Sequence, residues 1–396
     1  MTQLHAAGAS ARHRLLAPWR RLPLVDRWML GELIAPLIFG VAAFTAVSLS
    51  VGSVFELVRR VAESGLPLDV ALQILVLELP SFLVLSFPMA TLMASLLTYS
   101  KLSGNSELTA LRSIGVPTWR MVVPAVALSL VMTLLTFAFN EAIVPRTLSQ
   151  ADATLNRAIG RAVAGEEKDD VLFSKFGRVE MPDGDSEKGL THIFYARRFK
   201  QGVMEDVTLL DLSRSANRLL LRANQARWSD REAQWEFLDG QIIGVGGGSV
   251  ESITTARFDR YLYPLGNQPI RVAKLPHDAN EMTIGQARTA ERLLRESGDA
   301  QAARKLRVRI QEKFSFPAVC LVFGLMGSSL GGRPHSRRSR SQGFGLTVLL
   351  IFGYYLVAFS FSSLGVKGTL QPVLSAWLPV LIGLGTALIL LRQASR

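Results

Sequence analysis

The sequence of 396 residues contains a single cysteine, Cys320, which lies in an apolar run. One cysteine excludes an intrachain disulfide and argues against a thiolate metal site. The sequence also lacks a phosphate-binding loop, the HExxH zinc motif and a nucleophile elbow, and its histidines are scattered at positions 5, 13, 192, 277 and 335. We therefore expect no enzymatic site, no cofactor and no metal centre in this chain.

Charged residues are scarce, at 19% of the chain against 49% hydrophobic residues, and the mean hydropathy is +0.26. This balance is typical of a membrane protein with an additional soluble part. The formal charge of +12 could indicate nucleic-acid binding. However, the basic residues gather at the ends of apolar runs and form no single patch with interleaved aromatics, so they favour a role in membrane orientation and no nucleic-acid partner.

Six intervals of the sequence lack Asp, Glu, Lys and Arg, and each can cross a hydrocarbon core of about 30 Å. They lie at 33–55, 79–100, 121–140, 314–332, 341–366 and 368–391. The second helix is expected to begin earlier, near Val70, and to kink at Pro80 and Pro88. A signal peptide is the alternative for the first interval, but the apolar core of a signal peptide is about 7–15 residues long. We expect six transmembrane helices.

The distribution of basic residues predicts the topology, because loops on the cytoplasmic side carry an excess of Lys and Arg. Basic residues occur in the N-terminal segment, between the second and third spans, between the fourth and fifth spans, and at the C-terminus: Arg12, Arg14, Arg20, Arg21, Arg27, Lys101, Arg112, Arg120, Arg333, Arg337, Arg338, Arg340, Arg392 and Arg396. We therefore expect both termini to be cytoplasmic and the long segment after the third span to lie outside.

This outer segment has six short runs of alternating polarity, which predict strands at 171–176, 192–199, 207–212, 218–225, 236–243 and 253–263. Turn sequences at 182–184, 239–240 and 246–248 punctuate these runs. A single antiparallel β-sandwich or jelly roll is the simplest assignment. The glycines at 246–248 lack the lysine of a phosphate-binding loop and indicate a turn.

Two helices are predicted to join this β-domain to the fourth span. Thr283 and Gln286 form the T-x-x-Q pattern of a capping box, and a second helix starts at Asp299 and enters the membrane at Phe314. Small residues then give the fourth span a face suited to close helix contact, either within the chain or with a second subunit. These residues are Gly324, Gly327, Ser328 and Gly331.

The polar segment 101–117 between the second and third spans reads as a helix at the membrane surface. Asn105 or Ser106 can cap its start, and Gly115 and Pro117 supply its stop. At 100° per residue, Leu108, Leu111 and Ile114 form one apolar stripe, with Glu107 among them. A carboxylate inside an apolar stripe indicates a docking face. The alternative is a solvated turn in which Glu107 serves only the helix dipole.

The spans are almost free of ionisable groups, which argues against a transporter driven by an ion gradient. Energy for any transport would then come from a partner ATPase, and the segment 101–117 is where we expect it to dock.

Several short motifs along the chain resemble those of one family. They are Asp26-Arg27-Trp28, Leu79-Pro80-Ser81, Phe87-Pro88-Met89, Asn105 to Arg112 with Gly115, Asn140-Glu141 with Val144-Pro145-Arg146, and Ser375-Ala376-Trp377-Leu378-Pro379. With them the chain resembles the LptF/LptG family, the permease subunits of the ABC transporter that extracts lipopolysaccharide from the bacterial inner membrane. The resemblance covers nearly the whole length.

The resemblance implies a non-enzymatic permease with three spans, a periplasmic β-jelly roll and three more spans. It also implies several partners: a cytoplasmic LptB-like ATPase dimer, a second permease of the same type, an LptC- or LptA-like periplasmic bridge, membrane lipids, and lipopolysaccharide or a similar glycolipid as cargo. The coupling helix that enters the ATPase would comprise Glu107, Leu108, Leu111, Arg112, Ile114 and Gly115.

One departure from the family pattern concerns the cargo. Some members place a lysine near the outer end of the first span, whereas this chain has Glu56 there, followed by Arg59 and Arg60. Arg59 and Arg60 are our candidates for contacts with lipid phosphates, and interfacial anchoring is the alternative.

The expected division is 1–140 for the N-terminus and first three spans, 141–306 for the periplasmic domain and its helical linker, and 307–396 for the last three spans and the C-terminus. A membrane-anchored envelope scaffold without transport is the alternative function. A MacB/LolC-type protein fits less well, because that layout places its outer domain after the first of four spans, and here the domain follows the third.

Overall fold

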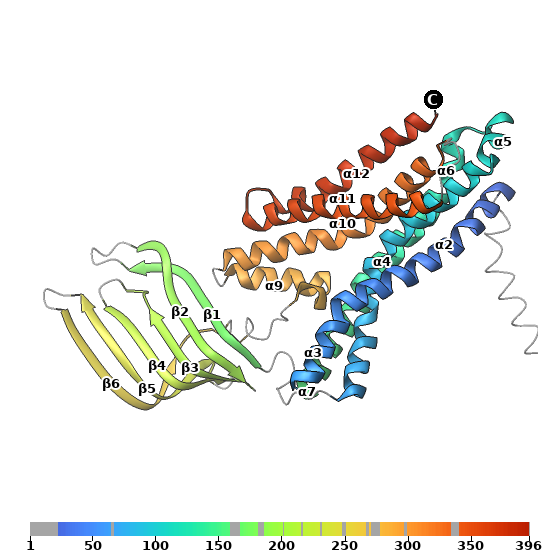
Figure 1. Ribbon diagram of the computed structural model, residues 1–396. Coiled ribbons are helices and arrows are strands. Elements are labelled where there is room, and N and C mark those ends of the chain that lie inside the picture. Colours follow the sequence, from blue (N-terminus) through green and yellow to red (C-terminus); the bar gives the residue numbers. More distant parts are fainter. Residues whose placement is uncertain are drawn as a thin grey trace, which may run out of the picture.

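The computed structural model describes residues 23–64, 67–158, 167–180, 186–200, 202–214, 217–229, 232–247, 251–266, 269–270, 278–296, 299–333 and 340–395. It consists of a long helical bundle and a curved antiparallel sheet, with the helix α9 (Ile284–Glu296) between them (Figure 1). Arg12, Arg14, Arg20, Arg21, Arg337, Arg338 and Arg396 of the predicted basic segments lie outside the described residues, as do the turn at 182–184 and Gly248.

The first three spans come before the sheet and extend beyond their apolar cores. The first is α2 (Leu24–Leu49), which continues through the π-helix η1 (Ser50–Val54) into α3 (Phe55–Ser64). The second is α4 (Leu68–Gly104), and the third is α6 (Thr118–Ala138), which continues through the π-helix η2 (Phe139–Ile143) into α7 (Val144–Ala158). Between α4 and α6 lies the short helix α5 (Glu107–Ser113).

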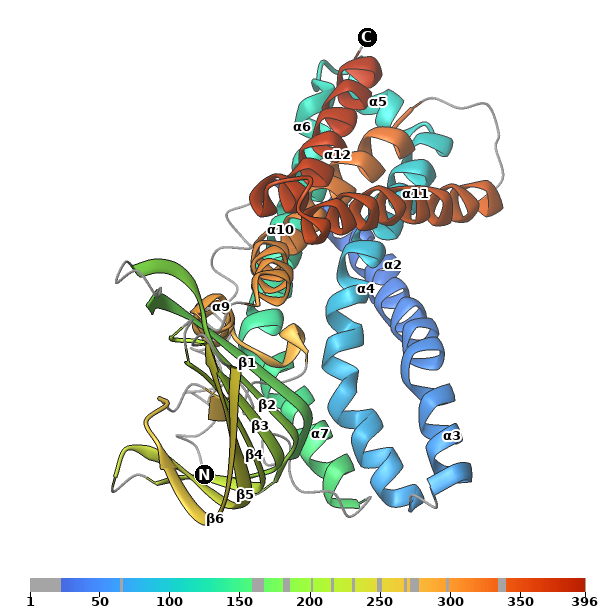
Figure 2. The same cartoon turned by 90° about the vertical axis from the view of Figure 1, so that its left-hand side faces the viewer.

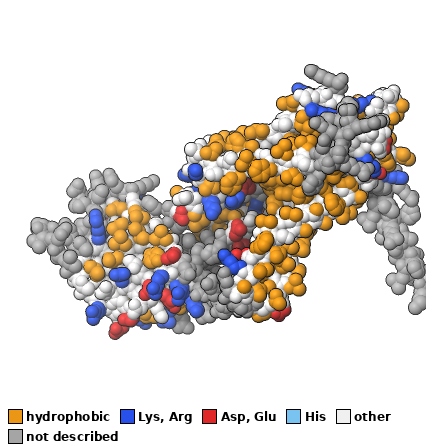
Figure 3. Space-filling view, in the orientation of Figure 1, with side chains coloured by type: hydrophobic (Ala, Val, Ile, Leu, Met, Phe, Trp, Pro, Cys, Tyr) orange, Lys and Arg blue, Asp and Glu red, His pale blue; other side chains and the backbone are white. Residues whose placement is uncertain are grey.

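The last three spans follow the sheet as α10 (Ala300–Gly331), α11 (Arg340–Lys367) and α12 (Pro372–Ser395). The prediction of six spans is confirmed, since six helices of the described residues are long and apolar enough to cross a membrane. Hydrophobic side chains cover much of the bundle surface, and charged side chains gather on the sheet and at the bundle ends (Figure 3). This is the distribution expected when lipid surrounds a bundle.

The fourth span occupies the centre of the bundle. Of its most apolar stretch 72% is buried, against 11% for the first and fifth spans. Its small residues lie directly against the second and third spans: a Cβ on Gly327 would lie 2.8 Å from the carbonyl oxygen of Leu92, and one on Gly324 would overlap Ser129. The small-residue face therefore serves packing within the chain, the first of the two predicted uses.

The sheet confirms all six predicted strands. They are β1 (Glu167–Glu180), β2 (Ser186–Lys200), β3 (Val203–Asp211), β4 (Asn217–Ser229), β5 (Gln234–Gly247) and β6 (Glu251–Tyr263). Each strand pairs antiparallel with the next in sequence, so the order is β1-β2-β3-β4-β5-β6. This antiparallel domain between the third and fourth spans fits the predicted jelly roll.

A polar row crosses the whole sheet at one level. The pairing of every two neighbouring strands skips one residue there, and the skipped residues are Asp170, Arg197, Asp206, Asn224, Asp239 and Asp259. Asp170, Asp206 and Asp239 have left-handed backbones with φ of 55°, 49° and 52°. Because one residue is skipped at the same level in all six strands, the strands keep their pairing on both sides of the row. Such irregularities increase the local bending of a sheet.

The sheet core includes Phe194, Phe199, Trp235 and Phe237, all fully buried. Leu294 of α9 packs against this core and also against a second cluster that joins α9 to α10. The sheet is thus connected by side-chain packing to the helix that becomes the fourth span.

The predicted domain boundaries at 140/141 and 306/307 both fall inside helical segments, η2 and α10. They stay predictions.

Candidate functional site

The sequence points to α5, and the structure gives it a different start from the expected one. Neither Asn105 nor Ser106 caps the helix through its side chain, so that prediction is wrong. Ser106 instead adopts a left-handed backbone with φ of 62°, and the side-chain amide of Asn105 donates to Glu107 at 2.8 Å. The reason is geometric: α4 continues to Gly104, which leaves only two residues for the turn into α5.

The predicted stop at Gly115 is confirmed. Gly115 has φ of 90°, a conformation that glycine adopts without steric cost. Its N–H donates to Arg112 at 2.9 Å, and the N–H of Val116 donates to Leu111 at 3.1 Å. These two bonds form a Schellman motif. The motif fixes the path from α5 into the third span.

The apolar stripe of α5 faces the bundle more than the solvent. Leu108 is only 3% exposed and packs in a cluster with Met29, Tyr99 and Met121, and Leu111 lies against the same cluster. Ile114, by contrast, is 77% exposed. The stripe is therefore not one outward docking face: its Leu108 side anchors the helix to the bundle. The helical wheel correctly placed these residues next to one another, but it could not show which of them face the bundle and which face the solvent.

The outer surface of α5 includes Ile114 and residues outside the stripe. Thr109, Ala110, Ser113 and Ile114 are exposed, and Glu107 is half-buried at the boundary between this surface and the anchored side. Gly115, also exposed, continues this surface at the end of the helix. The α5 surface, defined here as these six residues, is small and mainly uncharged, with one carboxylate at its edge.

Arg112 connects α5 to the far end of the fourth span. Its Nη2 donates to the carbonyl oxygen of Gly332 at 3.3 Å, and Ser103 Oγ donates to the carbonyl oxygen of Arg333 at 2.9 Å. The Nε of Arg112 is buried and has no hydrogen-bond partner. No local sequence pattern indicates this contact, because 220 positions separate Arg112 and Gly332.

Two ion pairs hold the spans together at the same end of the bundle. Arg120 Nη2 lies 2.8 Å from Asp26, and Lys101 Nζ lies 2.6 Å from Glu32. The first pair gives a structural role to the acid of the Asp26-Arg27-Trp28 motif. Together they connect the first span to the segments on both sides of α5.

At the sheet end of the bundle, Arg59 lies on α3, where its side chain is 62% exposed and 2.9 Å from Glu56. The side chain of Arg60 lies outside the described residues. Glu78 of α4 accepts a hydrogen bond from Ser53 in the π-helix η1. The structure therefore brings Arg59 together with Glu56, and the proposed role of Arg60 in lipid binding stays a prediction.

A second contact at this end was not foreseen. Both oxygens of Glu141 accept from the N–H of Ile284, at 3.1 and 3.0 Å, so a residue of η2 caps the start of α9. The predicted capping box is also present, with Gln286 donating to Thr283 Oγ1 at 3.2 Å and Thr283 donating to Gln286 Oε1 at 2.9 Å. A negative charge at a helix N-terminus is favourable. The third span is thereby attached to the linker of the sheet.

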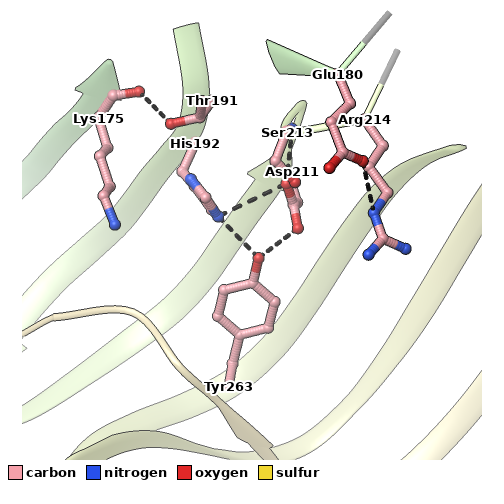
Figure 4. Close-up of polar contacts among 8 residues, drawn as sticks. All are labelled: Lys175, Glu180, Thr191, His192, Asp211, Ser213, Arg214 and Tyr263. Carbon is pink, nitrogen blue, oxygen red and sulfur yellow. Dashed lines mark hydrogen bonds and ion pairs between the residues drawn. The ribbon is translucent and has the colours of Figure 1, made fainter. Parts of the chain in front are cut away.

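A polar cluster lies where the last strand approaches the second and third (Figure 4). The hydroxyl of Tyr263 donates to Asp211 at 2.5 Å, and His192 Nε2 lies 3.0 Å from the same hydroxyl. Burial lowers the pKa of His192 against the attraction of Asp211, which disfavours protonation of the ring. Burial acts to raise the pKa of Asp211, but hydrogen bonds from Ser213 and Tyr263 hold it below its ordinary value.

This cluster explains how the sheet is held in its curved form. His192 and Asp211 pair directly on β2 and β3, whereas Tyr263 belongs to β6, three strands further along the sheet. A contact between them requires the sheet to curl back on itself. The sequence singled out none of these residues as a group.

Six apolar helices and an antiparallel sheet inserted after the third define a multi-pass membrane protein with one large extramembrane domain. Residues 27–393 match the model of the lipopolysaccharide export system permease LptF/LptG, and the chain belongs to this family. A comparison with curated proteins found no match. The family is that of a transporter's membrane subunit, so the protein is a multi-pass inner-membrane protein with a role in lipopolysaccharide export.

Proposed function

We propose that this permease is driven by a separate cytoplasmic ATPase that binds at the α5 surface. In this arrangement the α5 end of the bundle and both termini are cytoplasmic, and the sheet is periplasmic. The basic residues of the described α5 end support this orientation, since Lys101, Arg112, Arg120, Arg333 and Arg392 all lie there.

The observation that carries the proposal is the attachment of α5. The helix is anchored by Leu108 and held by Arg112 and Ser103 to the end of the fourth span. A force applied to the α5 surface is therefore transmitted to α10 without an intervening flexible segment. Helix α10 has 32 residues, which corresponds to about 48 Å, and its other end packs against α9, the linker to the sheet.

The partners follow from the same arrangement. The first and fifth spans have the least buried apolar stretches, which supports contact with a second permease subunit and a lipid cavity between the two. An LptC- or LptA-like bridge would receive the cargo from the sheet. We retain Arg59 and Arg60 as candidates for the phosphates of lipopolysaccharide, although Arg59 already pairs with Glu56.

The experiment is purification of the complex in mild detergent, with identification of its subunits and lipids by mass spectrometry. An ATPase subunit that is recovered with the wild type, and lost after Ile114→Asp on the α5 surface, supports the proposal. The matched control is Ile143→Asp, an exposed isoleucine at the opposite end of the third span. A scaffold function predicts recovery of envelope proteins without an ATPase.

The orientation is tested by labelling single cysteines in a Cys320→Ala background. A cysteine at Lys200, on β2, is expected to react in intact spheroplasts, and one at Ser113 only after the membrane is opened. The reverse pattern would overturn the topology.

A further inference from the structure

A groove of about 310 Å³ lies between the last three spans. Its walls come from α10, α11 and α12 and include Phe316, Val319, Tyr354, Ala358, Phe359 and Ala376. Helices α11 and α12 approach each other closely where Gly365 faces Ser375, and α11 then runs away from α12 (Figure 2). The groove is the wedge that this divergence leaves, and small residues on α11 and α12 keep it open.

The groove lies at membrane depth. Charged residues of α10 end at Lys313, and the groove continues along this helix to Val319, within the apolar part of the span. One end of the groove carries Arg309 and Glu312, and the rest of the lining has no charged residue. The groove thus extends from an interfacial rim into the hydrocarbon region.

An apolar groove at this depth is not a site for water. A water molecule needs two to four polar partners. Hydroxyls of Ser315, Ser362, Ser375, Tyr354 and Tyr355 belong to the lining, but most of its exposed surface is apolar. Hydrocarbon fills such a space favourably, because an empty groove leaves its lining without dispersion partners. The occupant is therefore expected to be a lipid chain.

The rim indicates which lipid this is. Arg309 Nη1 lies 2.7 Å from Glu312 Oε2, and the two side chains remain 47% and 23% exposed. This pair presents a positive and a negative charge side by side to the interface. A zwitterionic headgroup matches it, with the phosphate at the guanidinium and the ammonium at the carboxylate. An anionic headgroup offers no ammonium to the carboxylate of Glu312, which would repel it.

We propose that this groove binds a zwitterionic phospholipid, with one acyl chain between α10, α11 and α12 and its headgroup at Arg309 and Glu312. The site lies between helices of one chain, and it does not depend on the ATPase partner. The bound lipid supports α11, which is little buried by the rest of the chain.

The test uses the full-length protein in nanodiscs with equal amounts of phosphatidylethanolamine and phosphatidylglycerol, followed by native mass spectrometry after release. The wild type is expected to retain one phosphatidylethanolamine. Ala358→Phe fills the groove and should lower this retention about tenfold or more, since it displaces several methylene groups. The matched control is Val357→Phe, the adjacent position, which is 37% exposed and does not line the groove.

A second variant tests the rim without altering the groove. Glu312→Lys makes the rim wholly positive and should change the retained lipid from phosphatidylethanolamine to phosphatidylglycerol. The proposal is overturned if Ala358→Phe retains lipid as the wild type does, if the wild type retains phosphatidylglycerol equally well, or if it retains neither lipid. Retention of added lipopolysaccharide in place of phospholipid would also overturn it.

Discussion

The guanidinium of Arg112 donates a 3.3 Å hydrogen bond to the backbone carbonyl of Gly332, the residue at which the fourth span ends. This bond connects the surface helix α5 directly to the central span. Because α10 also packs against α9, and Leu294 of α9 packs against the sheet core, a continuous set of contacts runs from α5 to the sheet.

Arg112→Ala should leave ATPase binding intact but reduce lipopolysaccharide release. The variant removes a charge-assisted hydrogen bond, a contribution of about 1.5–3 kcal/mol to the attachment of α5. The measurement is cargo release per ATP hydrolysed by the reconstituted complex. Ser149→Ala is the control, since its hydroxyl bonds within α7, away from the α5 surface. If Arg112→Ala and wild type released the same amount of cargo per ATP hydrolysed, this contact would have no role in coupling.

Glu107 should pair with a cationic residue of the ATPase. Loss of one member of a buried pair costs about 2–5 kcal/mol, because the other charge is left desolvated. Glu107→Ala should therefore weaken ATPase recovery in a pulldown, and Glu107→Arg should weaken it further. Asp69→Ala, which removes an exposed carboxylate at the opposite end of the second span, serves as the control.

A role for Glu107 confined to the helix dipole predicts a much smaller effect. It amounts to about 0.3–1 kcal/mol of local helix stability, with no rescue by a charge reversal on the ATPase. Equal ATPase recovery from wild type and both Glu107 variants would end the pairing hypothesis.

Substitution of Leu108 should affect the stability of the permease, whereas substitution of Ile114 should affect ATPase binding. Leu108→Ala leaves a cavity in the cluster around Tyr99 and should cost about 2–5 kcal/mol, seen as a lower Tm of the permease without ATPase. Ile114→Ala should change the free energy of unfolding by no more than about 0.5 kcal/mol, because the side chain is exposed, and so leave Tm nearly unchanged, yet weaken ATPase binding. If Leu108→Ala lost ATPase binding at unchanged Tm, Leu108 would be a docking residue after all.

Acidification should destabilise the sheet through His192. The pKa of the folded-state imidazole is lowered, so the unfolded state binds more protons below about pH 6.5, and stability falls as the pH drops below that value. The lowered pKa of Asp211 acts in the same direction at more acidic pH. Comparison of Tm at pH 7.5 and 5.5 should show a larger loss for wild type than for His192→Gln.

The control for this pH dependence is Tyr195→Phe, which removes a hydrogen bond to Asp170 but no group that titrates between pH 5 and 7. It should retain the wild-type pH dependence. A His192→Gln variant with the same loss between the two pH values would assign the acid sensitivity to another group.

The sequence by itself determined the spans, the strands and a few helix ends. Uninterrupted apolar intervals and period-two alternation are local properties, so six spans and six strands could be read from residues within about twenty positions of one another. Two helix ends are local in the same sense. Gly115 ends α5 because glycine adopts the positive φ required there, and the capping box joins Thr283 and Gln286, which are three residues apart.

Only the tertiary structure decided what these elements contact. The wheel placed Leu108, Leu111 and Ile114 on one stripe, but it could not show that Leu108 faces Met29 and Tyr99 while Ile114 faces outward, because an apolar side chain carries no information about its partner. The contacts of Arg112 with Gly332, of Glu141 with Ile284 and of His192 with Tyr263 join residues 220, 143 and 71 positions apart. No local pattern encodes such pairs, since each depends on how whole helices and strands are packed.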